Sequence, residues 1–191
     1  MKRTLILMVV LLVNIVANAQ TEKRIYTKEE LESAKAREIQ KQLEAIQDSI
    51  NYVDAVCALE NLDFVLEAEQ LVFKRGQTAF VSSSTNFISL SDSKAVVQIA
   101  PFSGGGPNGV GGITVEGRAS NIKMKTDKKG NISFSMNVMG TGISANVDIA
   151  LSKGTNRASV TVNPNFNSNR ITLNGHLLPG ERSGVFKGTS F

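Results

Sequence analysis

The side chains that most often perform catalysis or bind metal ions are scarce in this sequence. Its 191 residues include one histidine, His176, and one cysteine, Cys57. One residue of each kind cannot supply the ligands of a structural Cys/His zinc site. No Gly-x-Ser-x-Gly motif is present, so His176 lacks a nucleophile in a recognisable setting and is expected as a surface residue on a polar strand face. We predict no catalytic residue, no metal ligand and no cofactor, and we favour a non-catalytic protein.

Two pairs of charged residues have the spacing of neighbours on one strand face. Glu67 and Glu69 are two positions apart, but this spacing is as typical of solvated glutamates as of a glycosidase acid pair. Lys123 and Lys125 belong to the densest basic group of the chain. No aromatic residue beside them offers a surface on which a nucleobase could stack. The sequence therefore predicts no nucleic-acid partner.

A glycine-rich segment matches the dinucleotide-binding pattern Gly-x-Gly-x-x-Gly at Gly104, Gly106 and Gly109. In that fingerprint a helix begins after the glycines and holds the pyrophosphate at its N-terminus. Here Pro107 interrupts the segment and a predicted strand begins at Ile113, so we treat the match as accidental. The ordinary interpretation is a loop between strands. The functional alternative is a lid over a binding site.

The first residues have the composition of a secretory signal. Lys2 and Arg3 precede an apolar run over residues 5–16, and small residues follow up to Ala19. We expect cleavage after Ala19, a mature chain that begins at Gln20, and periplasmic or secreted residence. The run is shorter than the ~20 apolar residues of a membrane-spanning helix, and no later run is longer, so we expect no transmembrane segment in the mature chain. Because the residue directly after the cleavage site is Gln20 and not a cysteine, we expect no lipid anchor.

Residues 20–61 are predicted to form an N-terminal helical segment. Thr27 and Glu30 have the spacing of a capping box, and no Pro or Gly occurs between Lys28 and Glu60, so one long amphipathic helix is expected there. Its apolar stripe consists of Ile39, Leu43, Ile46, Ile50, Val53 and Cys57. We favour packing of this stripe on the following domain, with Cys57 as a small buried hydrophobe. The alternatives are a short coiled coil with a second copy and a thiol that pairs between chains.

Residues 62–191 are predicted to form a mainly β domain, because alternating apolar and polar residues are separated by Gly- and Asn-rich turns. The predicted strands span residues 62–73, 78–82, 87–90, 95–100, 113–126, 132–139, 143–151, 158–162 and 170–177. Hairpin loops at residues 127–130 and 152–155 make the order an antiparallel meander. We predict that it closes as a small lipocalin-like barrel, with a sandwich as the alternative.

The interior of such a barrel is the candidate binding site. We expect it to hold a small apolar ligand beneath the glycine-rich loop. The predicted ligand-binding residues are Phe134, Met136, Val147, Val160, Gly104, Gly106 and Gly109. In the alternative function the interior is filled, and the protein is a structural or interaction protein of the cell envelope. It would then contact a protein partner, or associate with itself, through the helix stripe of Ile39, Leu43, Ile46, Ile50 and Val53.

Short glycine and aromatic motifs recur along the predicted β domain. They lie at residues 64–73, 86–90, 96–101, 111–115, 130–134 and 170–175. Together they resemble domain of unknown function 4251, a family of secreted Bacteroidetes proteins, over residues 62–178. The resemblance implies a cell-envelope protein of a Gram-negative gut-type bacterium with a mostly β, lipocalin-like domain. It implies no activity and no functional residue, because the family defines none.

Overall fold

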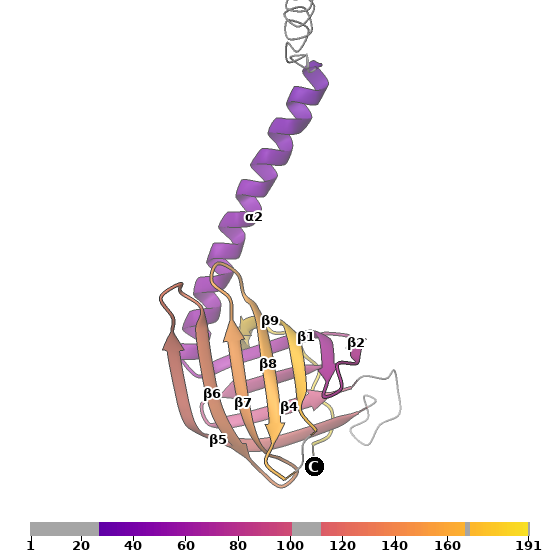
Figure 1. Ribbon diagram of the computed structural model, residues 1–191, viewed down its shortest axis with the longest axis vertical. Helices are drawn as coiled ribbons and strands as arrows, with labels where there is room; N and C mark the ends of the chain where they lie inside the picture. The colour runs from indigo at the N-terminus through magenta and orange to yellow at the C-terminus, as the bar shows by residue number, and fades with distance from the viewer. Residues whose placement is uncertain (1–26, 101–111, 167–168, 191) are drawn as a thin grey trace, which may run out of the picture. The chain divides into compact units, whose positions relative to one another are not determined.

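The computed structural model describes residues 27–100, 112–166 and 169–190 (Figure 1). The chain divides into two compact units, Met1–Gln42 and Leu43–Phe191, and the boundary falls inside helix α2, Lys28–Glu60. At the start of α2 the amide of Thr27 donates to Glu30 Oε2 at 2.9 Å, and the amide of Glu30 donates to Thr27 Oγ1 at 3.2 Å. The predicted helix and its capping box are therefore confirmed. The predicted signal and the glycine-rich loop lie outside the described residues.

The second unit contains an antiparallel barrel that closes on itself. Eight strands are neighbours in chain order from β1 through β3 to β9, and β9 pairs back with β1. Strand β2 pairs with residues 70–72 of β1, whereas β3 pairs with residues 63–67 of the same strand. The predicted meander and its closure as a barrel are confirmed. The elements are β1 Asp63–Phe73, β2 Thr78–Phe80, β3 Phe87–Ser91, β4 Lys94–Ile99, β5 Ile113–Thr126, β6 Ile132–Met139, β7 Ser144–Leu151, β8 Arg157–Pro164, β9 Ile171–Pro179 and η1 Gly180–Arg182.

The alternation of residue types explains the barrel. In β6 and β7 every second residue is buried, and the residues between them are partly or fully exposed. Two predicted hairpin turns are present, and Gly130 and Gly154 adopt the left-handed backbone conformation there, with φ of 88° and 83°. Glycine reaches this conformation without a steric penalty. The period-2 pattern and these turns together fix which face of each strand points inward.

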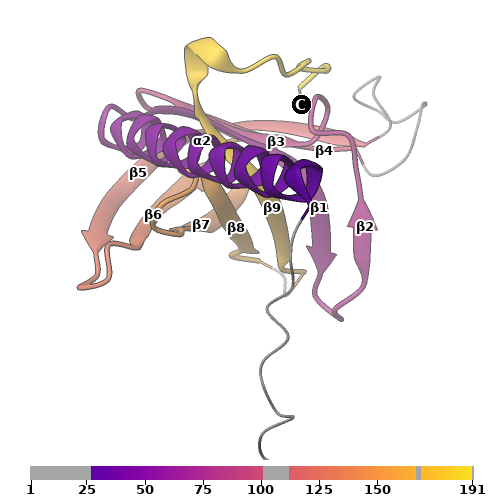
Figure 2. The same cartoon turned by 90° about the horizontal axis from the view of Figure 1, so that it is seen from above.

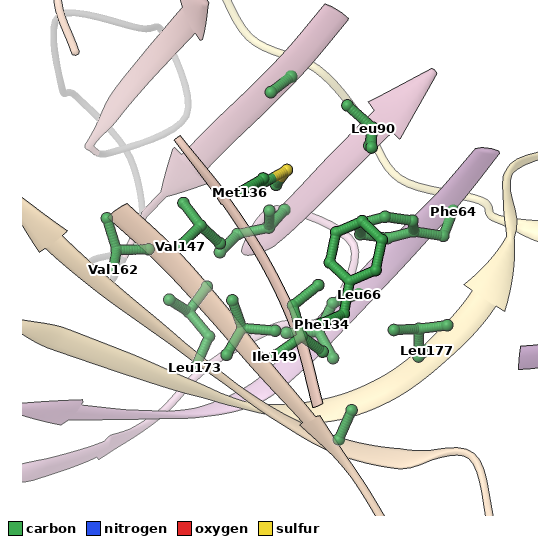
Figure 3. Close-up of a cluster of buried hydrophobic side chains, with 14 of the residues drawn as sticks. Phe64, Leu66, Leu90, Phe134, Met136, Val147, Ile149, Val162, Leu173 and Leu177 are labelled. Carbon is green, nitrogen blue, oxygen red and sulfur yellow. The ribbon is translucent and has the colours of Figure 1, made fainter. Parts of the chain in front are cut away.

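A continuous apolar core fills one part of the barrel. Figure 3 shows side chains from strands on all sides pointing into it. Phe64 of β1 and Phe134 of β6 meet edge to face, with ring centroids 5.6 Å apart. Helix α2 adds Ala55, Ala58 and Leu59 from its last two turns to the same core. The hydroxyl of Tyr52 donates to the carbonyl oxygen of Gly130 at 2.6 Å, which fastens this part of α2 to the turn between β5 and β6. Figure 2 shows the strands of the barrel from a second direction.

The predicted packing of the helix stripe on the barrel is wrong. Leu43, Ile46, Ile50 and Val53 are 49–62% exposed, and Ile39 in the first unit is exposed as well. At about 100° per residue, these positions lie on nearly the opposite side of α2 from the buried Ala55 and its neighbours. The barrel therefore contacts the face that carries Ala55, Ala58 and Leu59, and the apolar stripe faces away from it.

Cys57 follows the stripe and is exposed, so its prediction as a buried hydrophobe is also wrong. It lies seven residues after Ile50, which is two helical turns, and therefore on the same side of α2. Ala55, Ala58 and Leu59, rather than the stripe, are the residues that this end of the helix buries.

A C-terminal segment, residues 183–190, runs across the outside of the barrel; we call it the C-terminal strap. Its central contact is Gln98 of β4, whose side chain is fully buried. Gln98 Nε2 donates to the carbonyl oxygen of Phe186 at 2.8 Å, and Gln98 Oε1 accepts from the amide of Gly188 at 2.8 Å. Ser183 Oγ donates to Glu67 Oε1 at 2.7 Å. The strap thus covers outward-facing residues of β1 and β4.

The end of the strap is fixed by Glu116 of β5. Its carboxylate pairs with Lys187 of the strap, accepts from Ser190 Oγ at 2.6 Å, and pairs with Lys94 of β4 at 2.9 Å. The hydrogen bond from Lys187, followed by those from Ser190 and Lys94, lowers the pKa of Glu116 to about 2. The carboxylate is therefore ionised throughout the range in which most proteins are stable.

We predict that acid weakens this attachment. The pKa of Glu116 is lower in the folded chain than in the unfolded chain, so its stabilising contribution is complete above about pH 4.5 and is lost as the pH falls towards 2. Because surface ion pairs contribute little, Glu116→Gln should lower the free energy of unfolding by only about 1 kcal/mol at pH 7. Urea unfolding of both proteins from pH 2 to 7 measures the difference. A difference that is the same at pH 2 and pH 7 would contradict the prediction.

Candidate functional site

A cavity of about 780 Å³ opens at one end of the barrel. Ile113, the first residue of β5, lines it, whereas β5 ends at the turn that Tyr52 contacts. The cavity is therefore at the end of the barrel away from the packed turns of α2. Its volume lies within the range of small-molecule sites, about 300–1,000 Å³. It is lined by Phe73, Lys74, Arg75, Gln77, Val97, Ile99, Ile113, Val115, Gly142, Ile143, Ser144, Ala145, Val162, Pro164, Phe166, Asn169, Arg170 and Ile171.

The cavity continues the interior of the barrel beyond the core. Val97, Val115, Ala145 and Val162 are inward-facing residues at most 9% exposed, so they form its inner wall. These side chains are small compared with the phenylalanines and leucines that fill the core at the other end. Phe166 is 89% exposed and belongs to the rim. The space lies between these small residues and larger ones nearer the opening, such as Phe73 and Ile171.

Asn86 holds the wall of the cavity beside β4. Its side chain is fully buried; Nδ2 donates to the carbonyl oxygens of Ser82 at 3.0 Å and Ala100 at 3.1 Å, and Oδ1 accepts from the amide of Ala100 at 2.7 Å. Ala100 directly follows Ile99, which lines the cavity. A Cβ atom on Gly112 would lie 1.8 Å from the carbonyl oxygen of Ile99, so only glycine permits this close approach. Together Asn86 and Gly112 fix where β4 ends and β5 begins.

Basic residues stand at one side of the mouth. Lys74 and Arg75 lie in the turn between β1 and β2, and Arg170 immediately precedes β9. The register pairs Phe73 with Ile171, so this turn and Arg170 extend from adjacent strands at the same end of the barrel. The described residues that line the cavity include no Asp or Glu. The site is thus apolar inside and positively charged at its entrance.

The sequence predicts a binding site in the barrel interior, but the residues that it names do not line this cavity. Phe134, Met136, Val147 and Val160 are at most 1% exposed in the packed core, and none of them is among the lining residues. Gly104, Gly106 and Gly109 lie outside the described residues. The cationic mouth was missed. The signal in the sequence that could have indicated it is the Lys74-Arg75 pair in a predicted turn, together with Arg170 at the start of a predicted strand.

His176 has more partners than a simple surface residue. Its Nδ1 lies 2.9 Å from Asn156 Oδ1, and its Nε2 lies 3.7 Å from Glu69 Oε1. Asn156 also donates to the carbonyl oxygen of Leu177 at 3.2 Å, so these contacts hold the start of β8 against β9. No serine, threonine or cysteine makes a hydrogen bond with His176 within the described ranges. The cluster therefore stabilises the barrel wall.

The two glutamates do not act as a pair. Glu67 accepts from Ser183 Oγ and from the amide of Gly184 in the strap, whereas Glu69 approaches His176. The pairing of β1 with β9 shifts register between Ala68 and Gln70, so Glu69 occupies the irregular position. No group of three or more His, Cys, Asp or Glu side chains in the described parts of the chain is placed to hold a metal ion. No helix in those parts is long and apolar enough to cross a membrane.

The fold and the site together define a class: a small, closed, antiparallel barrel with an apolar cavity at one end and a helix packed at the other. The family model of a domain of unknown function (DUF4251) matches residues 47–177. A crystal structure of a DUF4251 family protein from Bacteroides eggerthii DSM 20697, at 1.95 Å resolution, is 51% identical. That match covers 77% of this chain and 99% of the other, with a TM-score of 0.65. A search of curated proteins gave no match. The chain belongs to the DUF4251 family, as the sequence motifs predicted.

Proposed function

We propose that this protein is a non-catalytic binding protein that holds a small apolar ligand in the cavity of its barrel. The observation that carries the proposal is the cavity of about 780 Å³, with apolar side chains on its inner wall and an opening to solvent. A void of this size with apolar walls favours a ligand that gains more from leaving water than from hydrogen bonding. We further propose that it acts in the periplasm or after secretion, because its first 19 residues have the composition of a cleaved signal.

Matched substitutions on β7 test the cavity. Ala145 is buried and lines the cavity, whereas Ala150 on the same strand is exposed on the outside of the barrel. Ala145→Phe places a phenyl ring in the space that the ligand would occupy, and Ala150→Phe adds the same ring elsewhere. We expect the neutral dye N-phenyl-1-naphthylamine to bind the wild type and Ala150→Phe, and to bind Ala145→Phe at least about tenfold more weakly, since about 1.4 kcal/mol suffices for that factor.

Thermal unfolding of both variants shows whether the barrel is intact, and Ala145→Leu serves as a milder change if the larger ring disturbs it. Native mass spectrometry of protein purified without denaturation adds a second readout, in which a bound mass should be present in the wild type and absent from the cavity variant. Equal dye binding by all three proteins, or no binding by any of them, would contradict the proposal.

A second candidate function is self-association through α2. The observation that favours it is the exposed stripe Leu43, Ile46, Ile50 and Val53, whose spacings of three and four are those of a two-stranded coiled-coil seam. Because the barrel contacts the opposite side of α2, it leaves this stripe accessible to a second copy. Two parallel helices in register would bring the two copies of Cys57 face to face, within reach of a disulfide.

We predict that Ile46→Glu abolishes a dimer without destabilising the barrel. Ile46 is 58% exposed in the single chain, so the substitution should change the free energy of unfolding of the monomer by less than about 0.5 kcal/mol. Light scattering after size exclusion measures the mass, and Lys41→Glu, on the other side of the same helix, is the control. A monomeric wild type, or a dimer that survives Ile46→Glu, would exclude this interface. Oxidation that links Cys57 across the dimer supports the parallel arrangement.

A further inference from the structure

The entrance of the cavity shows which kind of ligand it suits. We propose that the ligand is an amphipathic anion, with an apolar chain in the cavity and a carboxylate or phosphate group at the mouth. This inference rests on the proposed function, because it assumes that the cavity holds a ligand. The class is set by the cations at the entrance, Arg75 and Arg170, with Lys74 beside them.

The barrel closure brings these cations together from distant parts of the sequence. Arg75 lies two residues after Phe73, and Arg170 lies one residue before Ile171. Phe73 and Ile171 are partners in the β1–β9 register. The two arginines therefore extend from adjacent strands beyond the last paired residues, on the same side of the opening. The apolar side chains of Phe73 and Ile171 line the cavity directly below them.

The two arginines at this entrance lack a carboxylate partner in the described parts of the chain. Within the part of the chain that the structure describes, neither Arg75 nor Arg170 makes an ion pair, and no carboxylate lines the cavity. The sequences of residues 101–111 and 167–168 contain no Asp or Glu. By contrast, the structural cations Arg182 and Lys187 each pair with a carboxylate. The arginines at the mouth thus differ from those that stabilise the fold.

The chemistry of the two parts of the site selects one ligand class. A guanidinium group binds carboxylate or phosphate oxygens through parallel hydrogen bonds, and it stays charged at any physiological pH. An inner wall of valine, isoleucine and alanine offers nothing to a sugar or a peptide backbone, which would lose hydrogen bonds to water there. A cationic amphiphile would meet like charge at the entrance. An alkyl or acyl chain with an anionic end satisfies both parts.

Four probes with saturated chains and different end groups test the inference: tridecanoate, which like the others carries a twelve-carbon alkyl chain, dodecyl phosphate, dodecanol and dodecyltrimethylammonium. Each is titrated below its micelle concentration or solubility limit. We expect tridecanoate and dodecyl phosphate to bind about tenfold more tightly than dodecanol, a factor typical of one charge-assisted hydrogen bond at a partly exposed site. The trimethylammonium probe should bind more weakly than dodecanol. Acetate and inorganic phosphate, which lack the chain, should not bind measurably.

The double variant Arg75→Gln with Arg170→Gln should lose this tenfold preference for the anions and keep the wild-type affinity for dodecanol. The control is Lys128→Gln with Lys129→Gln, which removes the same charge in the turn at the other end of the barrel. Added salt should weaken anion binding to the wild type and not to the double variant.

The possible outcomes separate the two proposals. Equal affinity for the four dodecyl probes would overturn the anionic class and leave the apolar cavity standing. Binding of inorganic phosphate as strong as that of dodecyl phosphate would show an ion site that needs no chain, and would also overturn the inference. Failure of all four dodecyl probes to bind would refute the proposed function itself.

Discussion

Replacement of Phe134 by alanine is expected to lower the free energy of unfolding by about 3–5 kcal/mol, the usual cost of removing a buried phenyl ring. Phe134 is 1% exposed and meets the ring of Phe64 edge to face, so its removal leaves a void that neighbouring strands cannot close. Equilibrium urea unfolding, followed by circular dichroism, measures the change. Because domains of this size are stable by only about 5–15 kcal/mol, part of the variant should be unfolded at 37 °C.

Ser133→Ala provides the control for this prediction. Ser133 is the adjacent residue of β6 and is exposed on the outer face of the barrel. Its substitution should change the free energy of unfolding by less than about 0.5 kcal/mol. A loss below about 2 kcal/mol for Phe134→Ala would mean that the core is less tightly packed than the contacts indicate.

Asn86→Ala should have the second largest effect, a loss of about 2–4 kcal/mol, because both backbone groups of Ala100 lose their side-chain partner in a buried site. The substitution should also weaken dye binding, since Ile99 of the cavity wall is held in place through Ala100. Urea unfolding and dye titration measure the two effects.

Asn165→Ala is the matched control for Asn86. The side chain of Asn165 is exposed, and its Nδ2 donates to Ser144 Oγ at 2.8 Å, so its removal should cost less than about 1 kcal/mol. If both alanine variants had the same stability, the role assigned to Asn86 would be wrong.

The fold was largely predictable because its signals are local. Strands β5 and β6 have the predicted bounds, and α2 begins and ends where the capping box and the uninterrupted helical pattern indicate. Closure of the barrel followed from short hairpin loops and strict alternation. Each of these features depends on residues a few positions apart, which the sequence displays directly.

The orientation of α2 and the location of the site were not predictable in the same way. Apolar periodicity showed that Ile46 and Ile50 share a face, but it does not say which surface covers that face. The barrel instead contacts Ala55, Ala58 and Leu59, and the small side chains of the two alanines give a weak apolar signal. The cavity depends on how much of the closed barrel the inward-facing side chains fill, which no short stretch of sequence shows. Its cationic mouth depends on the pairing of two strands from opposite ends of the domain.

That pairing also shapes how the chain folds. Strand β1 finds its partner β9 only after every intervening strand has been made, so the closing contacts are among the longest in sequence separation that the domain contains. Domains in which contacts between residues distant in the sequence dominate fold more slowly than domains with local contacts. The chain must lose the entropy of loop closure before such contacts form. Until β9 arrives, one edge of β1 remains open. In a newly made chain the barrel therefore stays open until synthesis of the domain is nearly complete.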